Sequence, residues 1–446
     1  MQVSSLFERF TISHVILTSL VLHIFVIAQP QHLQIWDETI FLELVRNFLH
    51  GEDHTPYQLP GLNFFQGATI AIFGDNWFAW RIPSIIFGML TLFVFYRILC
   101  HVTSERNALL ATAILSFDTI FFVHSTLFLR DVPLIFFGML SILFYFRKNY
   151  FLCAIPLGFA FLIKETALLF FIFLVIFHIS TKKPWKYNIH QVKTGFLFIG
   201  IVFGSFIIPL WIYDVVFQPI VYEPVIPLSE TADGKYIPIH YPKLKLMESR
   251  GYVYQEAVGK INNPVEHIQL MLSQGYILSE GYNVKNWDTR HTNFPWSWIL
   301  PLPLPTDANG LGWVKEKIVD DTQRGQFNQG KIFAIEWRGD PNQSLWIIGF
   351  WGSIGFLGYS VMKNRNKTGL FVGTGIVSMY LPFLITSISG RVMFPYYFIL
   401  TIPFISIGIV LLLDLVRNSK LRMFSKGVLL AGVITWFLWF YPLKII

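Results

Sequence analysis

The stretch Trp36-Asp37-Glu38-Thr39, which follows an apolar segment at residues 12–29, decides how the chain is organised. Behind the two carboxylates the apolar residues fall on one helical stripe, formed by Ile40, Phe41, Leu44, Val45, Phe48 and Leu49. Such a helix is expected to lie along a membrane surface rather than to cross the membrane. Taken alone, Asp37 and Glu38 suit a helix start. They also suit a base and its helper that act on a lipid-borne substrate.

The composition indicates a multi-pass membrane protein. Of the 446 residues, 54% are hydrophobic and only 14% are charged, whereas about 25% are charged in soluble domains. This excludes an ordinary soluble enzyme. The net charge of +7 comes from basic residues scattered over short connections between apolar segments, which is the positive-inside pattern and gives no indication of nucleic-acid binding.

The apolar segments predict the transmembrane helices. Counting roughly 17 to 22 apolar residues per crossing, we expect about eleven spans. They lie near residues 12–29, 82–99, 107–124, 131–147, 151–163, 166–180, 195–213, 345–362, 369–388, 393–413 and 427–443. No small-residue cleavage site follows the first segment, so we expect a retained span rather than a signal peptide.

The basic residues predict the orientation. Lysines and arginines concentrate on alternate connections, so we expect a cytoplasmic N-terminus. Two long loops, residues 30–80 and 214–344, then lie on the extracytoplasmic side. We divide the chain into an N-terminal transmembrane module (1–213), which contains the first outer loop, a large outer loop (214–344) and a C-terminal transmembrane module (345–446).

The outer face is predicted to collect charged residues at the ends of three spans. They are Arg130-Asp131, Lys164-Glu165 and Ser389-Gly390-Arg391. Charged residues at span ends are often interfacial anchors. However, these lie on the same side as Asp37 and Glu38, and cations next to carboxylates suit a phosphate-bearing lipid and a base.

The large outer loop is predicted to form a small mixed α/β region. A helix is expected to begin at Asn263-Pro264, and strands are expected at Trp313–Val319 and Lys331–Trp337. The motif from His291 to Trp298 places Trp296 and Trp298 around Ser297. These rings suit either anchoring in the headgroup layer or stacking on a sugar.

Other motifs give little support to other chemistries. Gly325 to Lys331 reads G-x-x-x-x-G-K but continues with Ile332 instead of Ser or Thr, so we do not predict a P-loop. The sequence contains no Asp-x-Asp pair. His50, Asp53 and His54 have metal-ligand chemistry, but a solvated helix end explains them better. We expect no metal site and no cofactor.

The motifs together resemble the protein O-mannosyltransferases and the wider GT-C glycosyltransferases, which use polyprenyl-phosphate sugars. The resemblance rests on Asp37-Glu38, on the run from Phe73 to Ser84 that contains Arg81, and on the Arg130, Lys164, His291 and Arg391 motifs. It covers nearly the whole chain and implies an all-α, multi-pass GT-C fold with interfacial helices in the first outer loop. There are three departures from the family pattern. The stretch Leu59-Pro60-Gly61-Leu62-Asn63 lacks the family's lysine, Tyr397 stands where many members have His, and the large loop is too short for the repeat domain that eukaryotic members carry, so the resemblance is to a short form without it.

The resemblance also implies an activity. We expect a mannosyltransferase that carries mannose from a dolichyl or related polyprenyl phosphate to Ser or Thr hydroxyls of exported proteins, with inversion and without a metal. Asp37 and Glu38 would be catalytic. Arg81, Arg130, Asp131, Lys164, Glu165 and Arg391 would bind the donor, and His291, Trp296 and Trp298 would serve the acceptor or the interface.

Two alternatives remain open. A GT-C transferase acting on a lipid or glycan acceptor would share these features. A lipid flippase or transporter is the non-enzyme alternative, but it predicts charges buried in mid-span and broken helices. Transfer of oligosaccharide to Asn would need a Trp-Trp-Asp motif, which is absent. The expected partners are the lipid-linked sugar, an acceptor protein or peptide and the lipids of a prokaryotic cell membrane; the oligomeric state is open.

Overall fold

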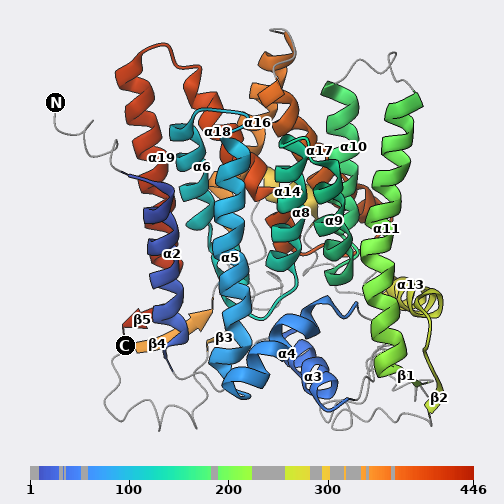
Figure 1. Cartoon of the computed structure of the whole chain (residues 1–446). Helices are drawn as coiled ribbons and strands as arrows, with labels where there is room; N and C mark the ends of the chain where they lie inside the picture. Colours follow the sequence, from blue (N-terminus) through green and yellow to red (C-terminus); the bar gives the residue numbers. More distant parts are fainter. Residues whose placement is uncertain are drawn as a thin grey trace.

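A bundle of upright helices with short crosswise elements at one end forms the structure, a computed structural model (Figure 1). It describes residues 10–29, 34, 37–51, 59–181, 189–222, 257–281, 294–301, 316–317, 333–337, 341–362 and 367–445. The helices of the N-terminal half are α2 (Ile12–Ile27), α3 (Asp37–Leu49), α4 (Gly61–Phe73), α5 (Trp77–Leu99), α6 (Glu105–Ser116), α7 (Thr119–Thr126), α8 (Asp131–Phe146), α9 (Tyr150–Ile163), α10 (Ala167–Thr181) and α11 (Ile189–Phe217). Those that follow are α13 (Pro264–Gly281), α14 (Pro295–Ile299), α16 (Gln343–Met362), α17 (Lys367–Ile388), the 3-10 helix η3 (Pro395–Leu400), α18 (Ile402–Asp414) and α19 (Ser419–Phe440).

Every predicted apolar segment contains a helix. Within the described ranges, five helices are long and apolar enough to cross a membrane, and the bent pair α6–α7 makes a sixth candidate. Others are apolar but shorter; α9 has 14 residues and α10 has 15. Both Asn76 and Asn149 cap helices with their side chains, which fixes the starts of α5 and α9.

The segment predicted as one span at 107–124 is broken instead. Helices α6 and α7 meet at an angle of 67°. Asp118, which is buried at the break, accepts a hydrogen bond from the Phe121 N–H (3.0 Å) and so starts α7 as a new helix. Its other oxygen accepts one from the Trp346 indole (3.3 Å). The segment predicted at 393–413 also begins differently, because η3 precedes α18.

Two groups of helices build the core. One contains α5, α8 and α9, the other contains α16, α17 and α18, and contacts between α10 and α17 and between α6 and α18 join them. Aromatic rings fill the junction, where Phe173 lies 5.6 Å from Phe371 and 5.4 Å from Phe404. A Cβ at Gly408 would stand only 1.7 Å from the Ser353 hydroxyl, so glycine permits the close approach of α18 to α16.

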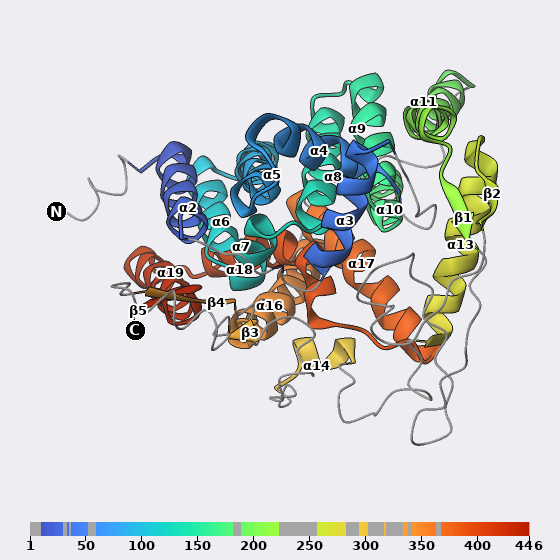
Figure 2. The same ribbon diagram turned by 90° about the horizontal axis from the view of Figure 1, so that it is seen from below.

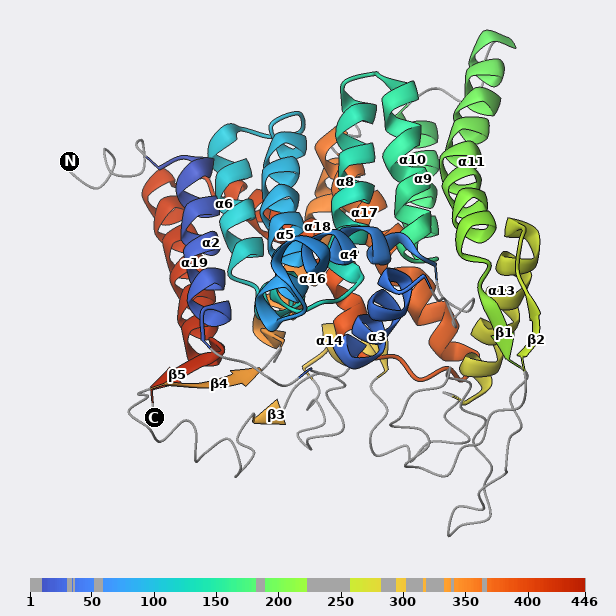
Figure 3. The same ribbon diagram turned by 60° about the horizontal axis from the view of Figure 1, so that its bottom comes forward.

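Helices α3 and α4 lie across the lower end of the bundle (Figures 1 and 3). The apolar stripe of α3 buries Phe41, Leu44 and Val45, as its spacing predicts. A Cβ at Gly61 would lie 2.6 Å from the carbonyl oxygen of Leu162, so α4 begins directly against the end of α9. These contacts hold the start of α3 beneath the bundle.

The short loop between α4 and α5 is tied to α3 by Asp75. This carboxylate accepts hydrogen bonds from the Arg46 guanidinium (2.7 Å) and from the Trp80 indole (2.6 Å). Burial alone raises the pKa of Asp75, but these hydrogen bonds outweigh it and leave the pKa below its usual value. The carboxylate therefore stays ionised and holds α3 against the start of α5.

Short strands complete the described chain. Antiparallel β1 (Ile220–Tyr222) and β2 (Ala257–Lys260) form one pair, and β3 (Glu316–Lys317), β4 (Phe333–Trp337) and β5 (Leu443–Ile445) form a second sheet in that order. Strand β4 confirms the strand predicted at Lys331–Trp337, and β3 lies within the one predicted at Trp313–Val319, whereas β5 was not predicted. The view from below places β1, β2, α11 and α13 at one edge and α2 and α19 at the opposite edge (Figure 2).

Candidate active site

Glu38 lies inside the protein, where Arg81 and the Phe128 backbone donate hydrogen bonds to its carboxylate. The Arg81 guanidinium donates to both carboxylate oxygens (3.0 and 2.7 Å), and the backbone N–H of Phe128 adds a third bond (2.8 Å). The side chains of Glu38 and Arg81 are 1% and 0% exposed. Arg81 was expected to bind the donor phosphate, but in this arrangement it has no exposed surface and instead ties α5 to α3.

Asp37 has different surroundings. Its side chain keeps some exposed surface, and within the described part of the chain it accepts no hydrogen bond. Protein encloses most of the carboxyl, and this burial raises its pKa, although the nearby positive charges of Arg130 and Lys164 oppose the shift. A carboxylate with open lone pairs and a raised pKa suits a general base.

Asp131 and Lys164 form a second buried pair at this end of the bundle. The Lys164 ammonium donates to the Asp131 carboxylate at 2.7 Å, and Nδ1 of His124 lies 3.3 Å from the other carboxylate oxygen. The ammonium also lies 5.9 Å and 5.7 Å from the ring centres of Tyr396 and Tyr397. Four separate parts of the chain, namely α7, α8, the α9–α10 turn and η3, therefore meet here.

Among the described residues, no carboxylate pairs with Arg130, the other cation near Asp37. It is half-buried, its guanidinium lies 4.9 Å from the ring centre of Phe41, and among the described residues it forms no ion pair. Its charge acts on Asp37. An arginine that lies next to a partly exposed base, and whose guanidinium N–H groups no carboxylate takes up, can bind a phosphate with two parallel hydrogen bonds.

The remaining donor-binding candidates are Glu165 and Arg391. Glu165 is exposed in the turn between α9 and α10, where its negative charge acts on Lys164. Arg391 is half-buried directly after Gly390, whose φ of +94° makes the turn from α17 toward η3. Within the described ranges neither residue has an ion-pair partner.

The two tryptophans of the outer-loop motif have separate environments. Trp298 is 0% exposed and packs against Tyr380 (6.4 Å) and Phe398 (6.0 Å), so it can neither enter a headgroup layer nor stack on a sugar. Trp296 is 37% exposed, with its ring stacked on Phe294 at 4.4 Å, and remains suited to both. His291 lies outside the described residues.

Sequence reasoning missed His124, Tyr396 and the Phe128 N–H. His124 and Phe128 stood inside or beside a segment interpreted as one continuous span, so they carried no signal of a site. Tyr396 was quoted only as part of a family motif. Among the residues that the structure describes, no group of three or more His, Cys, Asp or Glu side chains is placed to hold a metal ion; Asp53 and His54 are outside that set.

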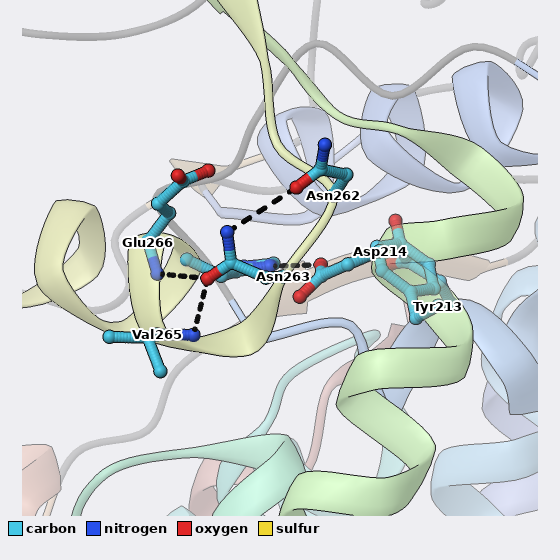
Figure 4. Close-up of polar contacts among 8 residues, drawn as sticks. Tyr213, Asp214, Asn262, Asn263, Val265 and Glu266 are labelled. Atoms are coloured by element: carbon cyan, nitrogen blue, oxygen red, sulfur yellow. Dashed lines mark hydrogen bonds and ion pairs between the residues drawn. The ribbon is translucent and has the colours of Figure 1, made fainter.

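A further buried pair connects α11 to the large outer loop. Nδ1 of His267, on α13, lies 2.6 Å from a carboxylate oxygen of Asp214, and both side chains are fully buried. Figure 4 shows Asp214 and Tyr213 facing the start of α13, where the Asn263 side chain accepts hydrogen bonds from the N–H groups of Val265 and Glu266 (3.1 and 3.0 Å). This cap confirms the helix start predicted at Asn263-Pro264.

Solved structures with the same arrangement are membrane glycosyltransferases. The S. cerevisiae protein O-mannosyltransferase Pmt1-Pmt2 complex bound to the sugar donor matches with a TM-score of 0.65 at 12% identity, over 97% of this chain and 89% of that one. ArnT from Cupriavidus metallidurans bound to undecaprenyl phosphate gives 0.55 at 15% identity, over 94% and 63%. The Archaeoglobus fulgidus oligosaccharyltransferase tethered with an acceptor peptide gives 0.53 at 12% identity, over 97% of this chain but only 55% of its own length.

These matches define the class: the chain is an integral membrane protein with the GT-C glycosyltransferase fold. A family model described as dolichyl-phosphate-mannose-protein mannosyltransferase matches residues 53–213, which confirms the resemblance indicated by the motifs. No curated protein matches the sequence. The match contains Arg81, Arg130, Asp131 and Lys164.

Proposed function

We propose that this protein is a glycosyltransferase that moves a sugar, most simply mannose, from a polyprenyl phosphate to a Ser or Thr hydroxyl of an exported protein. The family match and the fold support the lipid-phosphate donor. The observation that carries the proposal is the contrast between the two acidic neighbours. Glu38 has its lone pairs occupied by Arg81 and Phe128, whereas Asp37 is left open beside Arg130.

Asp37 acts as the base in this proposal. As the acceptor oxygen forms a bond to the anomeric carbon, its proton passes to the Asp37 carboxylate and the bond from that carbon to the phosphate oxygen breaks. Attack from the face opposite the leaving phosphate inverts the anomeric centre. The raised pKa of Asp37 makes its carboxylate a stronger base than an ordinary Asp.

Arg130 stabilises the phosphate as it leaves with the lipid. Its guanidinium is positioned by Phe41, and the negative charge that grows on the departing oxygen favours two hydrogen bonds from it. Because a side-chain cation supplies this charge, the proposal needs no metal. Asp131, His124 and Lys164 fix one another and shape the wall beside the sugar.

Donor transfer assays test this function. Membrane vesicles containing the protein are supplied with radiolabelled polyprenyl-phosphate mannose and a Ser/Thr-rich peptide, with EDTA present. We expect labelled peptide from the wild type and a loss of about 100- to 10,000-fold for Asp37→Asn, the usual value of a general base. Glu43→Gln, which removes another carboxylate from the same helix, is the matched control and should keep activity.

The acceptor is tested in the same vesicles. Peptides lacking Ser and Thr should remain unlabelled, and the membrane lipids are extracted and counted alongside the peptide. If the radiolabel is found only in the lipid fraction, the acceptor is a lipid and not a protein. Equal activity of Asp37→Asn and wild type would remove Asp37 as the base.

A further inference from the structure

A cavity of about 420 Å³ lies between α10 and α11, toward the end of the bundle opposite the candidate active site. Its floor includes Phe171 and Phe198, whose rings stack across the two helices at 6.4 Å. Tyr145 at the end of α8 and Tyr150 at the start of α9 also line it. Its volume is typical of a ligand site.

The cavity opens sideways, toward the surroundings of the bundle. Helix α11 stands at the edge of the molecule and packs mainly on α9 rather than on α10 (Figure 1). The rim residues Val175, Ile179 and Ile199 are 39%, 48% and 50% exposed. In a membrane protein an apolar opening of this kind faces the acyl chains of the bilayer.

One end of the cavity is polar. The Tyr145 hydroxyl lies 3.0 Å from Nδ1 of His178, the Tyr150 ring lies 5.9 Å from that of Tyr145, and Thr194 stands across from them on α11. An apolar chamber with hydrogen-bonding groups at one end matches the shape of a lipid, whose chain is apolar and whose ester and headgroup are polar.

Positive charge surrounds this polar end. Arg147, Lys148 and Lys193 are exposed beside the lining residues Tyr145, Tyr150 and Thr194. Between residues 145 and 213 the sequence contains a single acidic residue, Glu165, which lies at the other end of α10. The charge therefore favours a negatively charged headgroup over a neutral one.

We propose that this cavity is a binding site for an anionic phospholipid of the leaflet at this face. One acyl chain lies between α10 and α11, and the phosphate group meets the basic end formed by Arg147, Lys148 and Lys193. The site is separate from the sugar-transfer site and does not depend on the proposed reaction.

A cavity-filling substitution tests the position of the acyl chain. A Cβ at Gly195, which lines the cavity, meets no atom within 4 Å, and the same holds for Gly200 on α11, which does not line it. The full-length protein is placed in phosphatidylcholine vesicles with phosphatidylglycerol that carries a photoactivatable group in its acyl chain. We expect labelled peptides from α10 and α11 in the wild type and in Gly200→Leu. Gly195→Leu should lower this labelling about tenfold, the effect of displacing roughly two buried methylene groups.

A headgroup comparison tests the charge. Photoactivatable phosphatidylglycerol should label the cavity more strongly than the matching phosphatidylcholine probe, and Lys193→Gln should reduce that preference. Lys420→Gln, which removes an exposed lysine from α19, should not. Before labelling, each purified variant is checked by size-exclusion chromatography to elute like the wild type, which shows that it is folded. Equal labelling of Gly195→Leu and Gly200→Leu, or equal labelling by the two headgroups, would show general lipid contact and overturn the proposal.

Discussion

The carboxylates of Asp37 and Glu38 have different surroundings because consecutive helical residues point about 100° apart. Glu38 points to Arg81 on α5, and Asp37 points to the side where Arg130 and Lys164 lie. The sequence predicts the acidic pair and its place on a membrane face. It cannot show which carboxylate is paired, because the partner Arg81 is 43 residues away and the contact depends on how α3 packs under α5.

The pH dependence of transfer should report the environment of Asp37. A base must be deprotonated, and the pKa of Asp37 is raised by burial, so activity should fall with decreasing pH at a midpoint above the ordinary Asp value of about 3.9. Arg130 lowers this pKa by its charge. Replacing it in Arg130→Gln should therefore move the acid limb of kcat/KM to higher pH.

Arg46→Gln is the control for this shift, because Arg46 pairs with Asp75 outside the site. Its acid limb should coincide with that of the wild type. A limb that stays in place in Arg130→Gln, or that moves to lower pH, would contradict the placement of Arg130 beside Asp37.

The bend between α6 and α7 brings several site groups together. After Asp118 starts α7, the chain delivers His124, the Phe128 N–H, Arg130 and Asp131 within a short distance of Asp37 and Glu38. A hydropathy window averages across Asp118, which is why the sequence predicted one continuous span. A lone Asp within an apolar segment was the available signal, but the partner that satisfies it, Trp346, lies 228 residues away.

Removal of the Asp118 side chain should destabilise this element. Asp118→Ala deletes the cap of α7 and leaves the Trp346 indole N–H without its acceptor, so we expect a loss of about 2 to 4 kcal/mol in the free energy of unfolding. The measurement is unfolding by titration with sodium dodecyl sulfate. Asp118→Asn retains an oxygen at the cap and should lose less; an unfolding curve of Asp118→Ala that coincides with wild type would contradict the role of the cap.

At the scale of the whole molecule, each predicted apolar segment contains a helix because such a segment is a local run of apolar residues, but the break between α6 and α7 and the 3-10 helix before α18 were not predicted. The contacts between helices are not local and could not be predicted. Trp298 is an example: its motif suggested an exposed ring, but α16, α17 and η3 enclose it. Strands β3 and β4 lie within the two strands predicted in the large loop, but the pairing of β4 with the C-terminal β5 could not be predicted from the local sequence.

The unequal helix lengths make hydrophobic mismatch a property of this protein. Helices α9 and α10, which carry exposed apolar residues, are about 21 to 23 Å long. The hydrocarbon layer of a bilayer is about 30 Å thick, so these two helices are too short to cross it. Helix α5, with 23 residues, is long enough. Bilayer thinning is one way to accommodate short spans; beside α9 and α10, next to Lys164, we expect it to lower the phosphate of the proposed lipid donor toward Arg130.

Transfer should therefore depend on bilayer thickness. In vesicles that differ only in acyl-chain length, with the donor at a fixed mole fraction, the rate should be higher in thin bilayers than in thick ones, since thick ones deform at a greater energetic cost. Rates that are independent of chain length would show that the donor reaches Arg130 without local thinning. If the rate does depend on bilayer thickness, a cell can regulate this transfer through the length of its lipid chains as well as through the amount of the enzyme.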